Sequence, residues 1–454
     1  MTTENIYKLF LQHPLISTDT RNIVADSLFF ALKGENFDAN TFANQAIEAG
    51  AAYAIIDNAT YQINDKYILV DDALTALQDL ARHHRRQLTI PVIGLTGSNG
   101  KTTTKELIYA VLSQHFKTQA TIGNLNNHIG VPLTILTINQ EHQLAIIEMG
   151  ANHQKEIELL CSICQPTHAL ITNIGKAHLE GFGGIEGVKK GKGELYDYMK
   201  NLKVEKLQSQ ESMPVTFVNS DSQVLMGMQQ SKGVKNVIRY GSGGIANLVT
   251  GNLTENSPYV SLQWTNNNSN FNYTVKTKLT GPYNLDNMLA AICIGVYFNL
   301  TDDEINRGIE DYQPKNNRSQ IVETDTNILI CDFYNANPSS MFAAIENIGT
   351  IKANRKVIIL GDMFEMGIES VAEHEAVIKK ALGSAVDQMI FIGKDFYKAY
   401  SSFNHTSFEM KKKPIFYQTS DDAIIALTAS HIKNSTILIK GSRGMALERL
   451  TGLF

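Results

Sequence analysis

The stretch Gly94-Leu95-Thr96-Gly97-Ser98-Asn99-Gly100-Lys101-Thr102-Thr103-Thr104 decides the fold. It lies between an apolar run and a predicted amphipathic helix, which is the context of a phosphate-binding loop. Glycines let backbone N–H groups point at phosphate oxygens, and the N-terminus of the helix adds partial positive charge. We predict that Lys101 reaches the β- and γ-phosphates of ATP and that Thr102 offers its hydroxyl to Mg²⁺. Leu95 stands where the common G-x-x-x-x-G-K-[ST] pattern has its first glycine.

Two polar residues farther along the chain are candidate metal ligands. Glu148 follows the apolar run 144–147, and His178 comes shortly after the run 169–172. If these runs are neighbouring parallel strands, their carboxyl ends meet at one edge of the sheet, beside the phosphate-binding loop. The sequence therefore predicts a Mg²⁺ site made by Thr102, Glu148 and His178.

Outward from this stretch, the pattern predicts an α/β protein of three domains. Residues 1–88 alternate short apolar strands with helices, residues 89–313 contain the phosphate loop within a mostly parallel sheet, and residues 314–454 form a Rossmann-like α/β domain. Predicted strands of the central unit are 90–95, 144–147, 169–172, 215–218 and 237–240, followed by 248–253, 259–264 and 271–279. Those of the last unit are 328–331, 357–360, 389–392 and 436–439.

Composition narrows the class of protein. The chain has 454 residues, 43% of them apolar, and a net charge of −5, so the overall charge does not favour nucleic acid or a membrane surface as a partner. No apolar run reaches the roughly 20 residues that span a bilayer, and the N-terminus has no signal-peptide pattern. We expect a cytoplasmic protein that acts as a monomer.

Two local clusters have a structural and a functional interpretation. Cys161 and Cys164 form a lone C-x-x-C without further ligands at zinc spacing, so we interpret them as two helix residues one turn apart. The basic run 82–86 ends a predicted helix over 74–88, and we interpret it as a solvated helix end rather than a binding site.

Several motifs resemble the Mur ligase superfamily along almost the whole chain. Thr96 to Thr103 is similar to that family's ATP loop, which also lacks the first Walker glycine. The segments 18–21 and 28–34 resemble its UDP-sugar-binding N-terminal domain, and 148–153 and 177–183 its central ATPase domain. Tyr-Asn-Ala-Asn-Pro at 334–338, Gly-Asp-Met at 361–363 and Lys-Gly-Ser-Arg-Gly-Met at 440–445 resemble its C-terminal domain.

The resemblance assigns roles that the residues alone would not select. It implies that Lys192 is the lysine that family members carbamylate with CO₂, so that it joins the metal shell, and that Arg318 reaches the phosphates and Asp332 the ribose. The implied catalytic residues are Lys101, His178, Lys192 and Arg318. The implied nucleotide-binding residues are Gly97, Ser98, Asn99, Gly100, Lys101, Thr102, Thr103, Asn284, Asn287, Arg318 and Asp332. The implied substrate-binding residues are Thr18, Asp19, Thr20, Arg21, Lys33, Asn126, Asn127, Asn335, Asn337, Lys440, Ser442 and Arg443.

The motifs at 123–127, 334–338 and 440–444 look most like those of the family member that acts last in its pathway. The implied reaction joins D-alanyl-D-alanine to a UDP-N-acetylmuramoyl-tripeptide, with ATP phosphorylating the carboxylate first. Three alternatives are a family member that adds a diamino acid to the UDP-dipeptide, a non-catalytic nucleotide-binding relative, and a P-loop GTPase. The diamino acid ligase typically carries Asp-Asn-Pro-Arg, which this chain lacks, and no Asn-Lys-x-Asp element for guanine follows the loop.

The implied chemistry also predicts motion. An acyl phosphate hydrolyses if water reaches it, so we expect the C-terminal domain to close over the central domain during the reaction. Arg318 and Asp332 lie just past the predicted boundary between these domains, so closure would bring them to the nucleotide.

Overall fold

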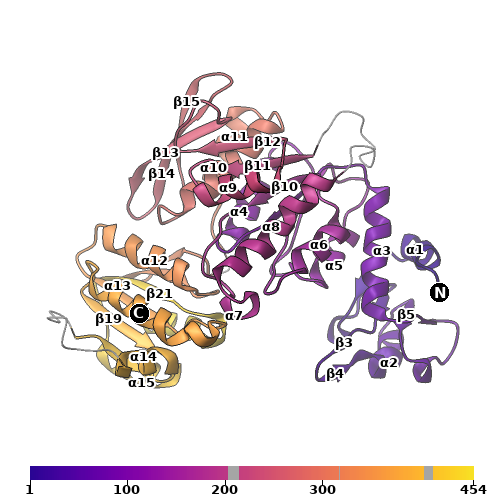
Figure 1. The fold of residues 1–454 in the computed structure, drawn as a ribbon. Helices are drawn as coiled ribbons and strands as arrows, with labels where there is room; N and C mark the ends of the chain where they lie inside the picture. Colours follow the sequence, from indigo (N-terminus) through magenta and orange to yellow (C-terminus); the bar gives the residue numbers. More distant parts are fainter. Residues whose placement is uncertain (203–213, 316, 403–412) are drawn as a thin grey trace.

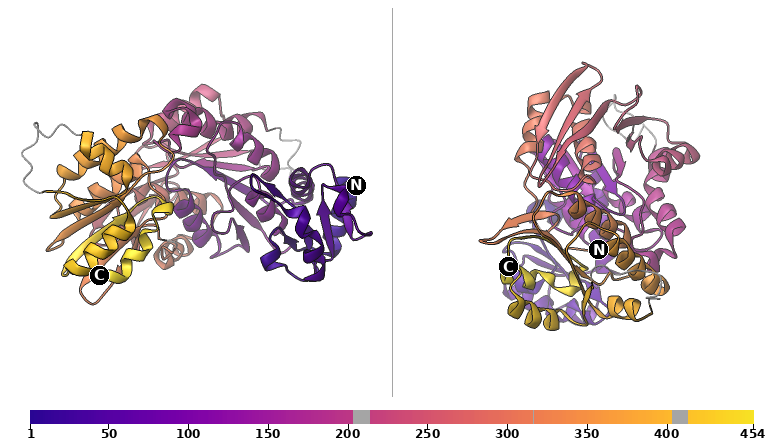
Figure 2. Two further views of the ribbon diagram at one scale, coloured as in Figure 1. Left: turned by 90° about the horizontal axis from the view of Figure 1, so that it is seen from below. Right: turned by 90° about the vertical axis from the view of Figure 1, so that its left-hand side faces the viewer.

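Three α/β units follow one another from the N-terminus to the C-terminus in this computed structural model, which describes residues 1–202, 214–315, 317–402 and 413–454. Figures 1 and 2 show the central unit between the other two, with the N-terminal unit at one end and the C-terminal unit at the other. The three main sheets fall within the three predicted domains, while the boundaries at residues 88 and 313 stay predictions.

The N-terminal unit is built on a parallel sheet with the strand order β1-β2-β5-β6. The strand β2 is buried throughout, because the run Leu-Phe-Phe packs between helices and sheet neighbours. Its strands are β1 (Ile16–Ser17), β2 (Leu28–Phe30), β5 (Tyr53–Ile56) and β6 (Tyr67–Leu69), with a hairpin of β3 (Lys33–Gly34) and β4 (Phe37–Asp38). Its helices are α1 (Thr3–Gln12), α2 (Ala43–Glu48) and α3 (Ala73–Gln87), with 3₁₀ turns at Thr20–Asn22, Ala39–Phe42 and Ala59–Tyr61.

The central unit holds a nine-stranded sheet in the order β15-β14-β13-β12-β11-β10-β7-β9-β8. The strands from β8 to β13 pair in parallel, and β13, β14 and β15 extend the sheet as an antiparallel meander. The strands are β7 (Val92–Thr96), β8 (Thr118–Ala120), β9 (Leu144–Glu148), β10 (His168–Ile171), β11 (Val215–Asn219), β12 (Val237–Gly241), β13 (Val249–Asn256), β14 (Val260–Asn266) and β15 (Phe271–Lys276). The helices are α4 (Lys101–Leu112), α5 (Gly130–Leu136), α6 (Glu156–Cys164), α7 (Leu179–Phe182), α8 (Ile185–Asn201), α9 (Gln223–Lys232), α10 (Asn284–Tyr297) and α11 (Asp302–Asp311).

The C-terminal unit has a six-stranded sheet in the order β16-β17-β21-β18-β19-β20, parallel except for the pairing of β16 with β17. Its strands are β16 (Gln320–Glu323), β17 (Asn327–Asp332), β18 (Lys356–Gly361), β19 (Gln388–Ile392), β20 (Ile415–Tyr417) and β21 (Ser435–Lys440). Its helices are α12 (Pro338–Thr350), α13 (Ser370–Leu382), α14 (Lys394–Ser402) and α15 (Ser420–Ser430), with 3₁₀ segments at Gly367–Glu369, Arg443–Met445 and Leu447–Leu453.

The predicted strands of the central and C-terminal units are confirmed within one or two residues at most ends, and up to three at β13 and β15. Three short edge or near-edge strands, β8, β16 and β20, were not predicted, because each offers only three or four residues of weak apolar pattern. The central unit continues past α10, because α11 follows it and packs on α4.

The interpretation of residues 82–86 as a solvated helix end was also wrong in part. Arg85 and His84 are buried at the end of α3, where that helix packs on α5 and α6 of the central unit. The Arg85 guanidinium donates to the carbonyl oxygens of Cys164 (2.9 Å) and Gln165 (3.1 Å), which closes the C-terminus of α6. His84 and Arg85 are therefore structural, and they join the N-terminal helix to the central unit, whereas Arg86 is exposed as expected.

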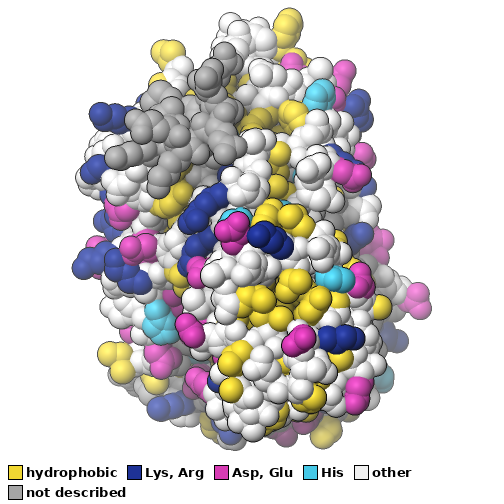
Figure 3. All heavy atoms as spheres, turned by 90° about the vertical axis from the view of Figure 1, so that its right-hand side faces the viewer, with side chains coloured by type: hydrophobic (Ala, Val, Ile, Leu, Met, Phe, Trp, Pro, Cys, Tyr) yellow, Lys and Arg dark blue, Asp and Glu magenta, His cyan; other side chains and the backbone are white. Residues whose placement is uncertain are grey.

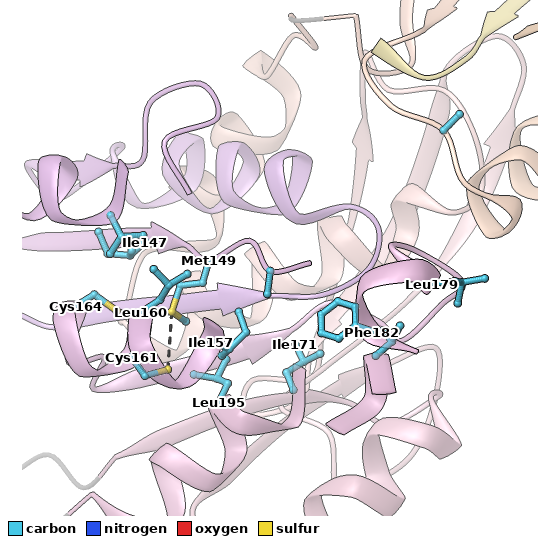
Figure 4. Close-up of a cluster of buried hydrophobic side chains, with 14 of the residues drawn as sticks. Ile147, Met149, Ile157, Leu160, Cys161, Cys164, Ile171, Leu179, Phe182 and Leu195 are labelled. Atoms are coloured by element: carbon cyan, nitrogen blue, oxygen red, sulfur yellow. Dashed lines mark hydrogen bonds between the residues drawn. The ribbon is translucent and has the colours of Figure 1, made fainter. Parts of the chain in front are cut away.

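Cys161 and Cys164 are two buried, free thiols one turn apart on α6, as predicted. Their sulfur atoms lie 3.9 Å and 3.7 Å from the sulfur of Met149, in the apolar cluster of Figure 4. Burial raises the pKa of the Cys164 thiol to about 12, so this pair is a packing element and not a reactive or metal-binding one.

No helix within the described residues is long and apolar enough to cross a bilayer. The face on the N-terminal side of the molecule carries acidic and basic side chains interspersed with exposed hydrophobic ones (Figure 3).

Candidate active site

A cleft of about 790 Å³ lies between the central and C-terminal units. It forms at the carboxyl edge of the central sheet because β7 pairs in parallel with both β9 and β10, which brings the loops after these strands together. The predicted site residues that line it are Ser98, Asn99, Gly100, Lys101, Thr102, Thr103, Asn126, Asn127, Glu148, His178, Asn284, Asn287, Arg318, Asp332, Asn335, Asn337 and Lys440.

The phosphate loop joins β7 to α4 and uses its glycines where no other residue fits. A Cβ at Gly97 would lie 2.0 Å from the Thr172 hydroxyl oxygen, and one at Gly100 would lie 2.6 Å from Asn287 Oδ1. Gly100 has a φ of 75° and begins α4 without any side-chain cap. The start of this helix is therefore left for an acceptor from outside the chain.

The Lys101 ammonium donates to the carbonyl oxygens of Gly97 (2.8 Å) and Ser98 (3.3 Å), and so lies folded over the loop. Burial lowers the pKa of Lys101, and the nearby positive charge of Arg318 adds to this, while Glu148 opposes it. A negatively charged ligand beside Lys101 and Arg318 would offset the cost of placing two cations together.

Glu148 is the residue of this site best suited to a metal ion. One of its oxygens, Oε1, accepts from Thr102 Oγ1 (3.2 Å) and Asn126 Nδ2 (2.8 Å). The other, Oε2, is buried and has no hydrogen-bond partner among the described residues. A buried, unpaired carboxylate oxygen costs free energy unless a cation completes it, and Mg²⁺ is commonly held by one or two carboxylates plus phosphate oxygens and water.

The described residues contain no cluster of three or more histidine, cysteine or acidic side chains that could hold a metal by itself. The Thr102–Glu148 pair fits Mg²⁺ on the condition that a bound nucleotide supplies further oxygen ligands.

Lys192 is fully buried on α8, in the same part of the protein but outside the lining of the cleft. Its amine donates to the Ala151 carbonyl (3.0 Å) and lies 5.1 Å from the centre of the Phe182 ring. Burial lowers the pKa of Lys192 well below its usual value, and Lys101 lowers it further. Figure 4 shows the apolar side chains of this region, among them Phe182 and Leu195, which exclude water from α8. This pKa shift increases the share of the amine that is neutral and nucleophilic.

His178 faces the C-terminal unit. Its φ is 52°, and its Nδ1 pairs with the carboxylate of Glu365, which follows β18. The hydrogen bond from His178 lowers the pKa of Glu365. The Glu365 carbonyl also accepts from the backbone N–H of Glu180 (3.3 Å), so Glu365 holds the loop that carries His178.

Asn284 and Asn287 are buried on the first turn of α10, where they connect elements inside the central unit. The Asn287 amide donates to Asn284 Oδ1 (2.9 Å), and Asn287 Oδ1 accepts from the Thr104 hydroxyl (2.9 Å). These bonds fix α10 against the phosphate-loop helix, a role that sequence reasoning did not assign to them.

The C-terminal wall of the cleft carries two cations with different partners. The Arg318 guanidinium stacks 3.8 Å from the centre of the Tyr334 ring, and its Nε has no hydrogen-bond partner among the described residues. The buried Lys440 pairs with Asp332 (2.7 Å), so both residues are engaged with each other. Arg318 is the cation of this wall that has hydrogen-bonding capacity left for a ligand.

Contacts between the two units hold the cleft in its present form. The Asn337 amide donates to Asn99 Oδ1 (2.8 Å), and the Lys176 backbone N–H donates to Ser339 Oγ (3.0 Å). The Lys176 side chain also pairs with Glu373 of α13. Sequence reasoning missed Lys176, Glu365 and Glu373, whose only signal was their position beside the motifs at 177–183 and 361–363.

The structure does not bring every predicted residue to this cleft. Thr18, Asp19, Thr20, Arg21 and Lys33 lie in the N-terminal unit and do not line it. There, Asp19 pairs with Arg21 (2.5 Å), and Lys33 pairs with Asp57 (2.8 Å).

Ser442 and Arg443 line a separate, smaller cavity of about 140 Å³. This cavity shares His178, Asn335, Asn337 and Glu365 with the main cleft.

Comparisons with known proteins agree along the whole chain. Three family models match it: the Mur ligase family catalytic domain at residues 14–85, the Mur ligase middle domain at residues 95–295, and the Mur ligase glutamate ligase domain at residues 317–443. The UDP-N-acetylmuramoyl-tripeptide–D-alanyl-D-alanine ligase of Bacillus subtilis is 34% identical over 442 residues, which are 96% of this chain and 92% of that one. The Escherichia coli enzyme of the same name is 34% identical over 439 residues, with the same coverage.

A similar arrangement of all three units occurs in a solved structure. The crystal structure of MurF from Acinetobacter baumannii superposes with a TM-score of 0.84 and 31% sequence identity. The superposition covers 96% of this chain and 92% of that one.

Proposed function

The chain belongs to the Mur ligase family, and on that premise we propose that it joins D-alanyl-D-alanine to a UDP-N-acetylmuramoyl-tripeptide at the expense of ATP. The product is the UDP-linked pentapeptide used in peptidoglycan synthesis. The proposal follows the two curated relatives named above, which match almost the full length of the chain.

The proposed chemistry rests on one observation, the groups that line a single cleft. The uncapped start of α4, the buried Glu148 with its unpaired oxygen, and Arg318 from the C-terminal side all line one cleft. A triphosphate in the loop would place its terminal phosphate among these groups, where Lys101 and Arg318 can neutralise the charge that is transferred. Thr102 and Glu148 would hold Mg²⁺, which would neutralise further phosphate charge, and His178 is proposed as a ligand once it leaves Glu365.

The reaction then has two steps. The terminal carboxylate of the tripeptide attacks the γ-phosphorus, a new C–O–P linkage forms, and ADP leaves. The amine of the dipeptide attacks the acyl carbon, loses a proton, and releases inorganic phosphate. An α-amino group has a pKa of about 7.7–8.0, so roughly a tenth is already neutral near pH 7 and accurate positioning counts for more than a strong base.

We further propose that Lys192 carries a carbamate in the active enzyme. The neutral amine adds to CO₂ and releases one proton, which converts an uncharged side chain into an anion beside the proposed metal site. The burial that lowers the pKa of Lys192 supports this, because only the neutral amine reacts with CO₂. With ¹³C-labelled bicarbonate, the wild-type protein should give a carbamate ¹³C resonance that Lys192→Arg lacks. Equal spectra would contradict this proposal without affecting the rest.

The proposed reaction is tested by ADP release from purified protein with ATP, Mg²⁺, the UDP-tripeptide and D-alanyl-D-alanine. We expect turnover that requires all four. Turnover with the UDP-dipeptide and a diamino acid instead would favour another Mur ligase activity, and no turnover with either pair would favour a non-catalytic relative.

We also propose that the protein works as a monomer in the cytoplasm, where its nucleotide substrates are made.

A further inference from the structure

Two residues one turn apart on α4 reach from the phosphate-loop helix to the neighbouring strands. The Thr102 hydroxyl donates to Glu148 Oε1 (3.2 Å) at the end of β9. The Lys105 ammonium donates to the carbonyl oxygen of Thr121 (2.6 Å), the residue directly after β8. Residues three positions apart share a face of a helix, and this face of α4 packs on β8 and β9. The proposed chemistry uses Thr102 and Glu148 but gives no part to Lys105.

Lys105 is a buried cation, with 2% of its side chain exposed. Besides the Thr121 carbonyl, its ammonium contacts the carboxylate of the neighbouring Glu106 (2.7 Å), whose side chain is 33% exposed. A buried ammonium costs free energy unless its donors are used. A lysine that only neutralised Glu106 could do so from the surface, so the burial of this amine points to the Thr121 carbonyl as its main contact.

Thr121 continues the path from Lys105 to Glu148. Its hydroxyl oxygen accepts from the backbone N–H of Glu148 (3.0 Å), and its own backbone N–H donates to the Ile146 carbonyl (3.0 Å). The residue is 1% exposed, so water does not compete for these bonds. Thr121 is therefore fixed between α4 and the last residues of β9, and it sets the position of the backbone from which the Glu148 side chain starts.

The loop after Thr121 brings a second contact to the same glutamate. Asn126 Nδ2 donates to Glu148 Oε1 (2.8 Å), and the Asn126 carbonyl accepts from the Gly150 N–H (2.7 Å). Glu148 is thus held at its backbone by Thr121 and at Oε1 by its side-chain partners, while Oε2 stays without a partner among the described residues. Outer contacts of this kind orient a carboxylate toward a metal ion.

We propose that Lys105 is a positioning residue of the Mg²⁺ site, which acts through Thr121 to hold Glu148 in place beside Thr102. The inference rests on the proposed function, because it supports the metal site of the ATP-dependent reaction. Neither Lys105 nor Thr121 lines the cleft. Lys105 therefore acts on the nucleotide and its metal only through the geometry of Glu148.

Titration calorimetry with a non-hydrolysable ATP analogue, in Mg²⁺ and in EDTA, tests the site without turnover. Mg²⁺ should strengthen binding of the analogue to the wild type. Thr121→Val keeps the shape of the side chain but removes the hydroxyl, and it should reduce this Mg²⁺ enhancement by about tenfold to a hundredfold, as other outer contacts of metal ligands do. Thr121→Ser keeps the hydroxyl and should stay within about twofold of the wild type. The affinity in EDTA should be unchanged in both variants.

Lys105→Met removes the bond to Thr121 while keeping a long unbranched side chain. It should reduce the Mg²⁺ enhancement by a similar factor, and the double variant with Thr121→Val should lose little more than either single variant, because both act along one chain of contacts. Glu106→Gln keeps the Lys105 bond to Thr121 and should change the enhancement by less than about threefold. In assays of ADP release, the Mg²⁺ concentration for half-maximal rate should rise in Lys105→Met, with an unchanged KM for D-alanyl-D-alanine.

A matched control separates positioning from stability. The Thr167 hydroxyl oxygen accepts from the Val92 N–H (3.0 Å), which is the same kind of bond in the same sheet, but at the amino ends of β7 and β10. Thr167→Val should therefore lower the thermal midpoint about as much as Thr121→Val and leave the Mg²⁺ enhancement at its wild-type value. Lys117→Met, which removes an exposed ion pair with Glu141, is the control for Lys105→Met.

The possible outcomes separate this inference from the proposed function. Variants at Lys105 and Thr121 that keep the wild-type enhancement, or that lose affinity equally in Mg²⁺ and in EDTA, would overturn the positioning role, as would a wild type that Mg²⁺ does not affect. If Lys105→Met does not fold in a thermal melt, the pair Thr121→Val and Thr121→Ser decides. The expected pattern of enhancement without any ADP release from D-alanyl-D-alanine and the UDP-tripeptide would support the positioning role and reject the proposed reaction.

Discussion

The central and C-terminal units both contain a parallel strand that is followed directly by a glycine and then, at once or after a short loop, by a helix. In the central unit, β7 leads through Gly97 and Gly100 to α4, whose start has no side-chain cap. In the C-terminal unit, β19 leads through Gly393 to α14, and the carboxyl group of Asp362 accepts from the N–H groups of Asp395 (3.0 Å) and Phe396 (2.9 Å). The first helix start is open to an outside anion, and the second is closed by an internal one.

The difference teaches what makes such a turn a binding site. A glycine and a helix N-terminus supply N–H donors in both units. In the C-terminal unit, Gly393 has a φ of 130°, and a Cβ there would be 2.1 Å from the Asp362 carboxyl carbon, so the plugging side chain fills the space completely. In the central unit, no side chain caps the start of α4, and Lys101 lies folded over the loop instead. Function depends on the missing internal acceptor as much as on the glycines.

The largest expected effect comes from a change in the phosphate loop, at the open helix start of the central unit. Lys101→Ala should lower the rate of ADP release about 10³-fold, because it removes the cation that neutralises the transferred phosphoryl group. The thermal midpoint should stay within a few degrees, since the ammonium only bonds two carbonyl groups of its own loop. Wild-type turnover in this variant would show that the loop does not bind the reacting phosphate.

A second test compares how the stability of the two units depends on pH. Burial lowers the pKa of His168 on β10 from 6.5 to about 4, so the unfolded state binds the proton more readily between these values. The stabilisation is therefore complete above pH 6.5 and is lost as the pH falls toward 4, by about 3 kcal/mol at most. Hydrogen exchange of the β10 amides at pH 7 and pH 4.5 measures this loss, and His168→Phe should reduce it.

Burial raises the pKa of Asp362 in the C-terminal unit. Its contribution to the free energy of unfolding therefore depends on pH in the opposite direction: it is present at low pH and is lost as the pH rises through the raised pKa. Acid should therefore weaken the β10 amides more than those of β18. Equal losses in the two strands would argue against His168 as the cause.

A third test opens the closed helix start. Asp362→Ala leaves two N–H groups of α14 without their acceptor and should destabilise the C-terminal unit by about 2 kcal/mol. The affinity of an ATP analogue for the phosphate loop of the central unit should be unchanged, and titration calorimetry can measure it. If phosphate-loop affinity falls with this variant, the two helix starts are not independent.

The smallest expected effect concerns the contact between the units. Lys176→Met removes the ion pair with Glu373, and because Lys176 is half exposed the pair should contribute about 1 kcal/mol or less. Small-angle scattering should show a slightly larger mean dimension without ligand and the same compact form with ATP analogue and UDP-tripeptide. An unchanged profile under both conditions would assign the docking to Asn337 and Ser339 instead.

The sequence was sufficient for the long buried strands and for most of the cleft, because buried parallel strands are continuous apolar runs and the phosphate loop has a strong local pattern. The short edge strands β8, β16 and β20 lack such a run. Glu148 could be placed beside the loop since it ends a strand that pairs directly with β7. The partners that come from another unit could not be predicted. Glu365 meets His178 only after the chain has folded across 187 residues, and no periodicity records such a contact.

The buried end of α3 has a practical consequence for dissecting the protein. Gln78 donates to the His128 carbonyl (3.1 Å), His84 bonds the Ile138 carbonyl (2.7 Å), and Arg85 caps α6. A truncation that begins at residue 89 would remove this helix from the ATPase unit. It would expose the apolar surface against which Leu77, Leu80 and Ala81 are buried and leave four carbonyl groups without these donors, so the fragment should precipitate. An expression fragment that starts at Asp72, the N-cap of α3, should keep it soluble.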